Sequence, residues 1–229
     1  MHTSGIKAFI FDMDGTVVNN MGVHFQSWRL FFAELGVAIS DQELRRQVNG
    51  QPNAAILREV LGSHLSEAEI ARLGQRKETL YRDLYQQQIR PLPGLLAFLR
   101  EAERLGTPMA LATNAHRDNV DFVMGNLGIV SFFRVIVSAE DVRRAKPDPE
   151  VYLIAARRLG VSAGQCLVFE DSRPGIEAAR RAGMCVIALA TTHAPDELQG
   201  LPVLQVVADY TRLHPATLLD GLTLVDCGH

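Results

Sequence analysis

Two aspartates, Asp12 and Asp14, stand two positions apart directly after the apolar run 8–11. In an extended backbone, side chains at this spacing point to the same side of the chain, so the two carboxylates lie close to each other. At about 4 Å they repel each other by about 1 kcal/mol in water and about 4 kcal/mol at an effective dielectric of about 20, and a bound cation would compensate that repulsion. A D-x-D motif alone can also be a solvated turn in which Asp14 caps a helix.

Further polar residues follow later apolar runs of the chain. Thr113 and Asn114 close one such run, Glu170 and Asp171 close another, and Lys146 stands in the motif A-K-P-D-P. Each has an ordinary alternative, which is a helix cap, a solvated pair of carboxylates or a surface lysine. Four acids with oxygen ligands suit Mg²⁺ and a phosphate group, and the lysine would balance the remaining charge.

These residues can come together only if the segments that carry them fold suitably, and the pattern of those segments predicts an α/β fold. Apolar, strand-like runs cover residues 8–11, 109–113, 135–138, 166–170, 185–190 and 203–207. After residue 90 these runs alternate with helical segments, which predicts a parallel sheet with helices on both faces. Open parallel sheets bind ligands at the carboxyl ends of their strands, and the candidate residues follow strands at that edge.

Residues 19–88 have a helical pattern throughout, which predicts an all-helical cap domain inserted into the α/β core of residues 1–18 and 89–229. Apolar residues recur at helical spacing on one expected face: Phe25, Trp28, Phe32 and Leu35. Ser66 with Glu69 forms an S-x-x-E capping box before a long helical segment. The two ends of an inserted unit must lie close together, so we expect residues near 16–20 and 88–93 to be paired.

Composition excludes several classes of function. The 229 residues are 47% hydrophobic and 21% charged, with a net charge of −3, so bulk charge favours no nucleic-acid or membrane partner. No apolar stretch approaches the ~18 residues that span a bilayer, and the first residues lack the apolar segment of a signal peptide. Cys166, Cys185 and Cys227 are widely spaced, with no C-x-x-C pair. This cysteine usage predicts a protein of the reducing cytoplasm. We expect a monomer.

The motifs, in this order, resemble those of the haloacid dehalogenase superfamily of phosphohydrolases. The resemblance covers nearly the whole chain and rests on D-x-D-G-T at 12–16, Thr113, K-P-D-P at 146–149 and E-D-S at 170–172. It implies a Rossmann-like core. The helical insertion resembles the smaller α-helical cap of the branch that includes β-phosphoglucomutase and many sugar-phosphate phosphatases.

The resemblance implies a covalent mechanism. Asp12 would be the nucleophile that forms an aspartyl-phosphate, and Asp14 would serve as general acid and then as general base. Thr113 and Lys146 would hold the transferring phosphoryl group, with Asn114 as a further donor to the substrate.

The resemblance also implies the metal site. Mg²⁺ would bind to Asp12, to the backbone carbonyl of Asp14 and to Asp171, with Glu170 as a ligand through water or as a neighbouring group that orients the ligands. The dehalogenases of the family lack an acid at the position of Asp14 and need no metal, so this chain does not resemble them.

Substrate-binding residues are expected in the cap. His24 and Lys77 align with cap residues of the sugar-phosphate branch, although His24 could equally be a half-buried helix histidine. The loop 49–53 resembles the specificity loop of the cap and includes Gly50 and Asn53. The mutases carry an arginine three residues after this glycine to grip a second phosphate, and Asn53 stands there in this chain.

These observations predict a Mg²⁺-dependent phosphatase that hydrolyses a small phosphorylated metabolite, a sugar or polyol phosphate, through an aspartyl-phosphate. One alternative is a β-phosphoglucomutase-like isomerase with the same intermediate. Another, from a different class, is a protein that binds a phosphorylated metabolite without turnover.

Overall fold

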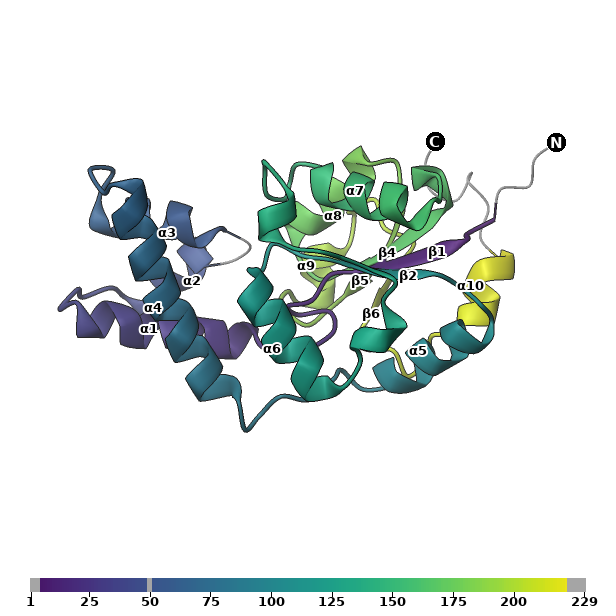
Figure 1. Ribbon diagram of the computed structural model, residues 1–229, viewed down its shortest axis with the longest axis horizontal. Coiled ribbons are helices and arrows are strands. Elements are labelled where there is room, and N and C mark those ends of the chain that lie inside the picture. The colour runs from purple at the N-terminus through teal and green to yellow at the C-terminus, as the bar shows by residue number, and fades with distance from the viewer. Residues whose placement is uncertain (1–4, 49–50, 222–229) are drawn as a thin grey trace. The chain divides into compact units, whose positions relative to one another are not determined.

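The computed structural model describes residues 5–48 and 51–221, and these form two compact units (Figure 1). One unit contains the described residues up to Asn19 together with those from Arg90 onward. The other unit is Asn20–Ile89.

Within the described residues the first unit contains a sheet of six strands that are all parallel, in the order β3-β2-β1-β4-β5-β6. The strands are β1 (Ala8–Phe11), β2 (Met109–Ala112), β3 (Val135–Val137), β4 (Cys166–Glu170), β5 (Cys185–Leu189) and β6 (Gln205–Val207). The prediction of a parallel sheet is therefore confirmed. Phe11 lies opposite Leu111 of β2 and Phe169 of β4, so the residues that follow these three strands leave at one edge.

Helices cover both faces of this sheet, as the sequence predicts (Figure 1). They are α5 (Leu95–Arg104), α6 (Arg117–Leu127), α7 (Glu150–Leu159), α8 (Arg173–Arg181), α9 (Pro195–Leu198) and α10 (Pro215–Gly221). Helices α7 and α8 lie on one face, and α5, α6 and α10 lie on the other. Among the described helices of the whole chain, none combines the length and the apolar character that crossing a bilayer requires.

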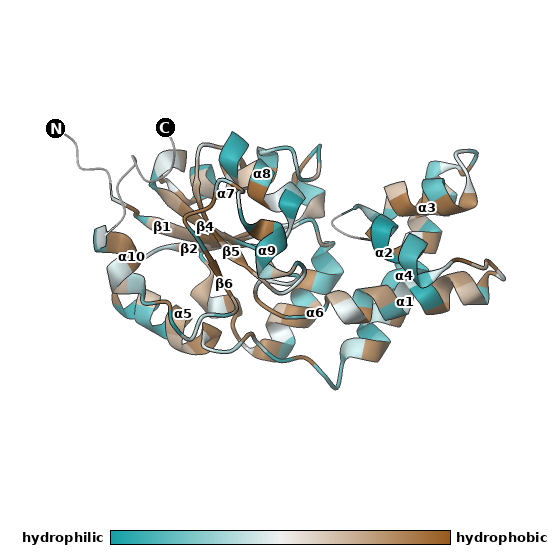
Figure 2. Ribbon diagram, turned by 180° about the vertical axis from the view of Figure 1, so that it is seen from behind, coloured by the Kyte–Doolittle hydropathy of each residue, from teal (hydrophilic) through white to brown (hydrophobic). Residues whose placement is uncertain are grey.

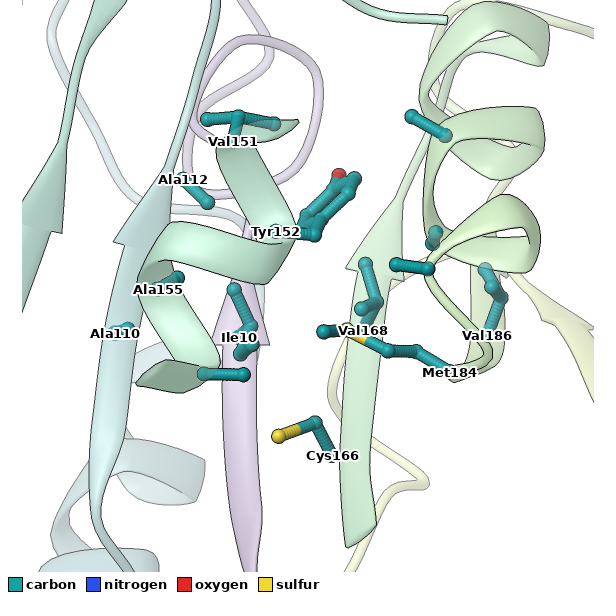
Figure 3. Packing of buried hydrophobic residues seen from close by; sticks show 14 of the residues in the cluster. Ile10, Ala110, Ala112, Val151, Tyr152, Ala155, Cys166, Val168, Met184 and Val186 are labelled. Carbon is teal, nitrogen blue, oxygen red and sulfur yellow. The ribbon is translucent and has the colours of Figure 1, made fainter. Parts of the chain in front are cut away.

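Strand β1 is completely buried because it packs on both faces. Ile10 belongs to the cluster beneath α7 and α8, together with Ala110, Val168 and the α7 residues that Figure 3 shows. Phe11 faces the opposite side and stacks on Phe169 with ring centroids 4.7 Å apart. The strands are accordingly the most apolar part of the unit (Figure 2). A strand held from both sides gives the residues after it a fixed starting point.

Two cysteines begin neighbouring strands of the sheet. Cys166 starts β4 and Cys185 starts β5, and both are buried. Cys166 is a free thiol, and burial raises its pKa to about 12, so it packs as a small uncharged side chain. Cys227 lies outside the described residues.

The second unit is a bundle of α1 (Met21–Glu34), α2 (Asp41–Val48), α3 (Asn53–Leu61) and α4 (Glu67–Tyr85). Its core contains Trp28 and Phe32, as predicted for one face of α1. Leu35 was wrongly assigned to that face: the helix ends at Glu34, and Leu35 is 43% exposed. The capping box is confirmed, since the Ser66 hydroxyl accepts from the backbone of Glu69 and the Glu69 carboxylate accepts from the backbone of Ser66.

The segments that leave and re-enter the α/β unit lie side by side. The backbone nitrogen of Leu92 donates to the carbonyl of Val17 at 2.9 Å, and Val18 forms an isolated antiparallel bridge with Pro91. Both segments belong to the α/β unit itself, so that unit fixes the two ends of the insertion.

Candidate active site

Three carboxylates meet at the carboxyl edge of the sheet. Asp12, which follows β1, and Glu170 and Asp171, at the end of β4, are each buried and each offer an oxygen atom within 4.8 Å of the others. Asp12 is 6% exposed, and its backbone nitrogen donates to the carbonyl of Phe169 at 3.0 Å. Asp14 is partly buried two residues further on. The structure therefore brings together three of the four acids that the sequence predicts for this edge.

A tight turn at Gly15 makes this close approach possible. Gly15 has a φ of +77°, and a β-carbon there would meet the carboxylate of Asp171. The turn is also closed by the hydroxyl of Thr191, which donates to the carbonyl of Gly15. A side chain at position 15 would therefore meet both backbone strain and a collision.

Two threonines after β5 belong to the same edge, although neither was predicted from the sequence. Besides the bond from Thr191, the hydroxyl of Thr192 donates to Oδ2 of Asp171. The signal was available, because both residues leave an apolar strand at the carboxyl edge in the same way as the residues after β1, β2 and β4.

Lys146 is a buried, fully engaged cation. It is 5% exposed, and its Nζ donates to Oδ1 of Asp12 at 2.6 Å, to Oε1 of Glu170 at 2.8 Å and to the carbonyl of Ala112 at 3.0 Å. An ammonium group has three N–H donors, so these bonds use all of them. The alternative of a surface lysine is therefore wrong. The side chain of Asn114 accepts from the backbone nitrogen of Lys146 at 3.1 Å and so fixes the loop that carries the lysine.

Glu170 is saturated with donors. Its Oε1 accepts from Lys146 and from the hydroxyl of Tyr152, and its Oε2 accepts from the backbone nitrogen of Asp171 and from both the backbone and the hydroxyl of Ser172. A β-carbon on Gly175 would collide with this carboxylate, which lies against the first turn of α8. These bonds favour the alternative in which Glu170 orients the neighbouring ligands over the one in which it binds the ion through water.

Thr113 follows β2 and has a hydroxyl that is fixed but still able to donate. The residue is 1% exposed, and its Oγ1 accepts from the backbone nitrogen of Ala115 at 3.1 Å. A hydroxyl that accepts in this way keeps its own proton for a phosphoryl oxygen. His116, three residues on, pairs with Glu140 at 2.9 Å.

The electrostatics of the edge favour a cation. Burial raises the pKa of Asp12 to about 7; the ammonium of Lys146 lowers it, but the carboxylates of Glu170 and Asp14 add to the increase. Burial, followed by Glu170 and Asp12, raises the pKa of Asp171 well above its usual value. Burial lowers the pKa of Lys146, but Asp12 and Glu170 outweigh burial and raise it to about 12, so the lysine stays charged. An all-oxygen donor set with excess negative charge fits Mg²⁺.

In the helical unit, three of the expected substrate-binding residues form one polar cluster. Lys77 is 1% exposed, and its Nζ lies 2.9 Å from Nδ1 of His24 and 2.9 Å from Oε1 of Glu78. The amide of Asn53 donates to the same Glu78 oxygen at 2.7 Å. Gly50, the fourth expected residue, lies outside the described residues. Glu78 was missed because neighbouring helix residues normally point in different directions.

Replacing Glu78 by glutamine should destabilise the protein in a pH-dependent way. Burial raises the pKa of Glu78, but Lys77, His24 and the amide of Asn53 together lower it to about 2. A carboxylate whose pKa is lower in the folded state stabilises that state above its unfolded pKa, near 4.5, and the contribution disappears as the pH falls toward 2. We expect Glu78→Gln to cost about 3 kcal/mol of unfolding free energy at pH 7.

Denaturant unfolding at about pH 7 and about pH 3 would measure this difference. Glu43→Gln is the matched control, since Glu43 is an exposed residue of the same unit. An equal loss for Glu78→Gln at both pH values would contradict the assignment.

Comparisons with known proteins agree with this geometry. Residues 9–189 match the family described as haloacid dehalogenase-like hydrolase. The chain is 31% identical over 175 residues to fructose-1-phosphate phosphatase YqaB of Escherichia coli, covering 76% of this chain and 92% of that relative. It is 33% identical over 190 residues to the chloroplastic 5-amino-6-(5-phospho-D-ribitylamino)uracil phosphatase of Arabidopsis thaliana, covering 82% of this chain but about half, 51%, of that longer relative.

A solved structure is similar to this chain over most of its length. CbbY from Rhodobacter sphaeroides, in complex with phosphate, matches with a TM-score of 0.82 and 26% identity, covering 94% of this chain and 99% of that one. The family match extends over most of the chain and includes the acids after β1 and β4 and the buried lysine between them. The chain belongs to the haloacid dehalogenase-like hydrolases.

Proposed function

We propose that this hydrolase is a Mg²⁺-dependent phosphatase that acts on a small phosphorylated sugar or polyol through an aspartyl-phosphate. The observation that carries the proposal is the position of Asp12 at the end of a fully buried strand, with Lys146 bound to one oxygen of its carboxylate. A carboxylate held in this way has a fixed direction of attack, and the adjacent ammonium compensates charge on a phosphoryl group.

The proposed reaction has two displacements. The carboxylate of Asp12 attacks phosphorus, the bond from phosphorus to the leaving oxygen breaks, and Asp14 gives that oxygen a proton. Asp14 then takes a proton from the water that attacks phosphorus, the bond between phosphorus and the Asp12 oxygen breaks, and inorganic phosphate leaves with Asp12 restored as a carboxylate. Lys146 exchanges its hydrogen bond to Asp12 for one to a phosphoryl oxygen. The hydroxyl of Thr113 donates to a second phosphoryl oxygen.

Asp12, Asp171 and the backbone carbonyl of Asp14 would hold the Mg²⁺. Bound there, the ion supplies the positive charge that lets a phosphate group approach several carboxylates. The hydroxyl of Thr192 binds one oxygen of Asp171 and so restricts the orientation of that carboxylate.

The substrate class is inferred from relatives and from the polar cluster of the helical unit. YqaB is named for a sugar phosphate and the Arabidopsis relative for a phosphorylated ribityl chain, which is a polyol. His24, Asn53 and Lys77 would contact the part of the substrate that does not react. Glu78 balances the charge of Lys77, so the cluster suits neutral hydroxyl groups better than a second phosphate.

Hydrolysis should therefore dominate over phosphoryl transfer back to a sugar. A mutase must hold a bisphosphate intermediate by its distal phosphate, and the amide of Asn53, which is bonded to Glu78, is a poor replacement for a bidentate guanidinium. A screen of sugar and polyol monophosphates should release inorganic phosphate. In a nuclear magnetic resonance time course with β-glucose 1-phosphate and a trace of the 1,6-bisphosphate, accumulation of glucose 6-phosphate with little free phosphate would overturn this proposal in favour of a mutase.

A further inference from the structure

The hydroxyl of Tyr152 links the first turn of α7 to the catalytic edge of the sheet. Tyr152 is completely buried, and its hydroxyl donates to Oε1 of Glu170 at 3.0 Å. The same oxygen accepts from Nζ of Lys146 at 2.8 Å. We propose that Tyr152 is a positioning residue that sets the place of Lys146 through Glu170. The inference rests on the proposed function, since it assigns Lys146 to the phosphoryl group.

Tyr152 contacts this ion pair in two ways. Its hydroxyl binds the carboxylate, and its ring lies beneath the ammonium, with Nζ of Lys146 4.7 Å from the ring centroid. Figure 3 shows the side chain extending from α7 toward the carboxyl end of β4, beside the packed residues Ile10 and Val168. A ring packed in this way holds its hydroxyl in one place.

The hydroxyl matters because Lys146 must change partners during the reaction. All three of its N–H groups are engaged, and contact with a phosphoryl oxygen requires it to leave Asp12 while keeping Glu170. When the Tyr152 hydroxyl is present, Oε1 of Glu170 accepts hydrogen bonds from two donors, Tyr152 and Lys146. Without the hydroxyl, Lys146 is the one donor left to that oxygen among the residues that the structure describes. The ammonium is then drawn toward Glu170 and away from the phosphoryl position.

Tyr152→Phe keeps the ring and its volume and removes the hydroxyl alone. We expect kcat to fall about three- to tenfold and the dissociation constant of inorganic phosphate, measured calorimetrically with Mg²⁺ present, to rise by a similar factor. The matched control is Tyr210→Phe, because Tyr210 is also completely buried in the α/β unit and its hydroxyl has no hydrogen-bond partner among the described residues. This control should leave kcat and phosphate affinity unchanged.

A second variant tests whether Tyr152 acts through Glu170. In a Glu170→Gln background, adding Tyr152→Phe should weaken phosphate binding by less than twofold, since the positioned carboxylate is already gone. Equal losses in both backgrounds, unchanged phosphate affinity in Tyr152→Phe, or the same loss in Tyr210→Phe would each overturn the inference. If the unaltered protein released no phosphate from any monoester, the proposed function would fail instead, and phosphate binding would still test the link between Tyr152 and Glu170.

Discussion

Replacing Asp12 by asparagine is expected to lower phosphate release by a factor on the order of 10⁴ or more, as removal of a nucleophile does in other covalent mechanisms. The amide cannot form the bond to phosphorus, and the neighbouring acids are in no position to take over: Glu170 is saturated with donors, and Asp171 is held by Thr192. A continuous assay of released phosphate from an aryl phosphate and from the best sugar phosphate would measure the loss.

The same variant should fold. Burial raises the pKa of Asp12 from 3.8 to about 7, so in the absence of metal its ionisation opposes folding increasingly above pH 3.8, and the cost is complete above pH 7. A neutral amide removes this cost. In thermal unfolding with chelator present, the melting temperature of Asp12→Asn should therefore lie at most a few degrees below that of the unaltered protein. An inactive variant that is also unfolded would leave Asp12 without a demonstrated role in the chemistry.

Asp14→Ala is the comparison that separates the two aspartates. Loss of a general acid and base typically costs about 10²- to 10⁴-fold, less than loss of the nucleophile. The backbone carbonyl of Asp14 survives the change, so Mg²⁺ should still bind. Small and equal effects of Asp12→Asn and Asp14→Ala would contradict the division of labour.

Chelation of divalent metal is expected to reduce phosphate release on the order of 10³-fold or more, the equivalent of several kcal/mol of transition-state stabilisation, and added Mg²⁺ should restore it. The physical reason is the charge at the edge of the sheet, where the carboxylates of Asp12, Glu170 and Asp171 meet and Lys146 is the cation bound to two of them. A phosphate group adds more negative charge, and the site needs a further cation before the group can approach.

A measurement independent of turnover supports the same test. If Mg²⁺ binds the folded protein but not the unfolded chain, the melting temperature should rise as the Mg²⁺ concentration is increased. Asp171→Asn should weaken that response, while Glu43→Gln on the helical unit should leave it unchanged. Full activity in excess chelator, with no thermal response to Mg²⁺, would rule out the metal assignment.

Much of the α/β unit could be predicted from the sequence because its strands are short, apolar and sharply bounded. The run Ala8–Phe11 fits a buried strand, and a parallel sheet then places the residues after each strand at one edge. Asp12, Glu170 and Asp171 were found by that rule. Lys146 was found by its motif, and the structure adds that it is buried and that all three of its donors are engaged.

What could not be predicted depends on side-chain contacts across distant segments. Tyr152 looks like an ordinary apolar-face residue of α7, and only the fold brings its hydroxyl to Glu170. Thr192 follows a strand by the same rule as the others and could have been found. Leu35 was misplaced because helical periodicity gives no signal for the residue at which α1 stops.

Because Val18 pairs with Pro91 inside the α/β unit, the two ends of the insertion are held by the unit that carries Asp12. Any segment whose ends lie equally close together can take the place of Asn20–Ile89 without moving β1 or the acid that follows it. Evolution can therefore exchange the inserted block as a module. If the insertion selects the substrate, as the proposed function has it, substrate range and reaction chemistry can be inherited or replaced separately.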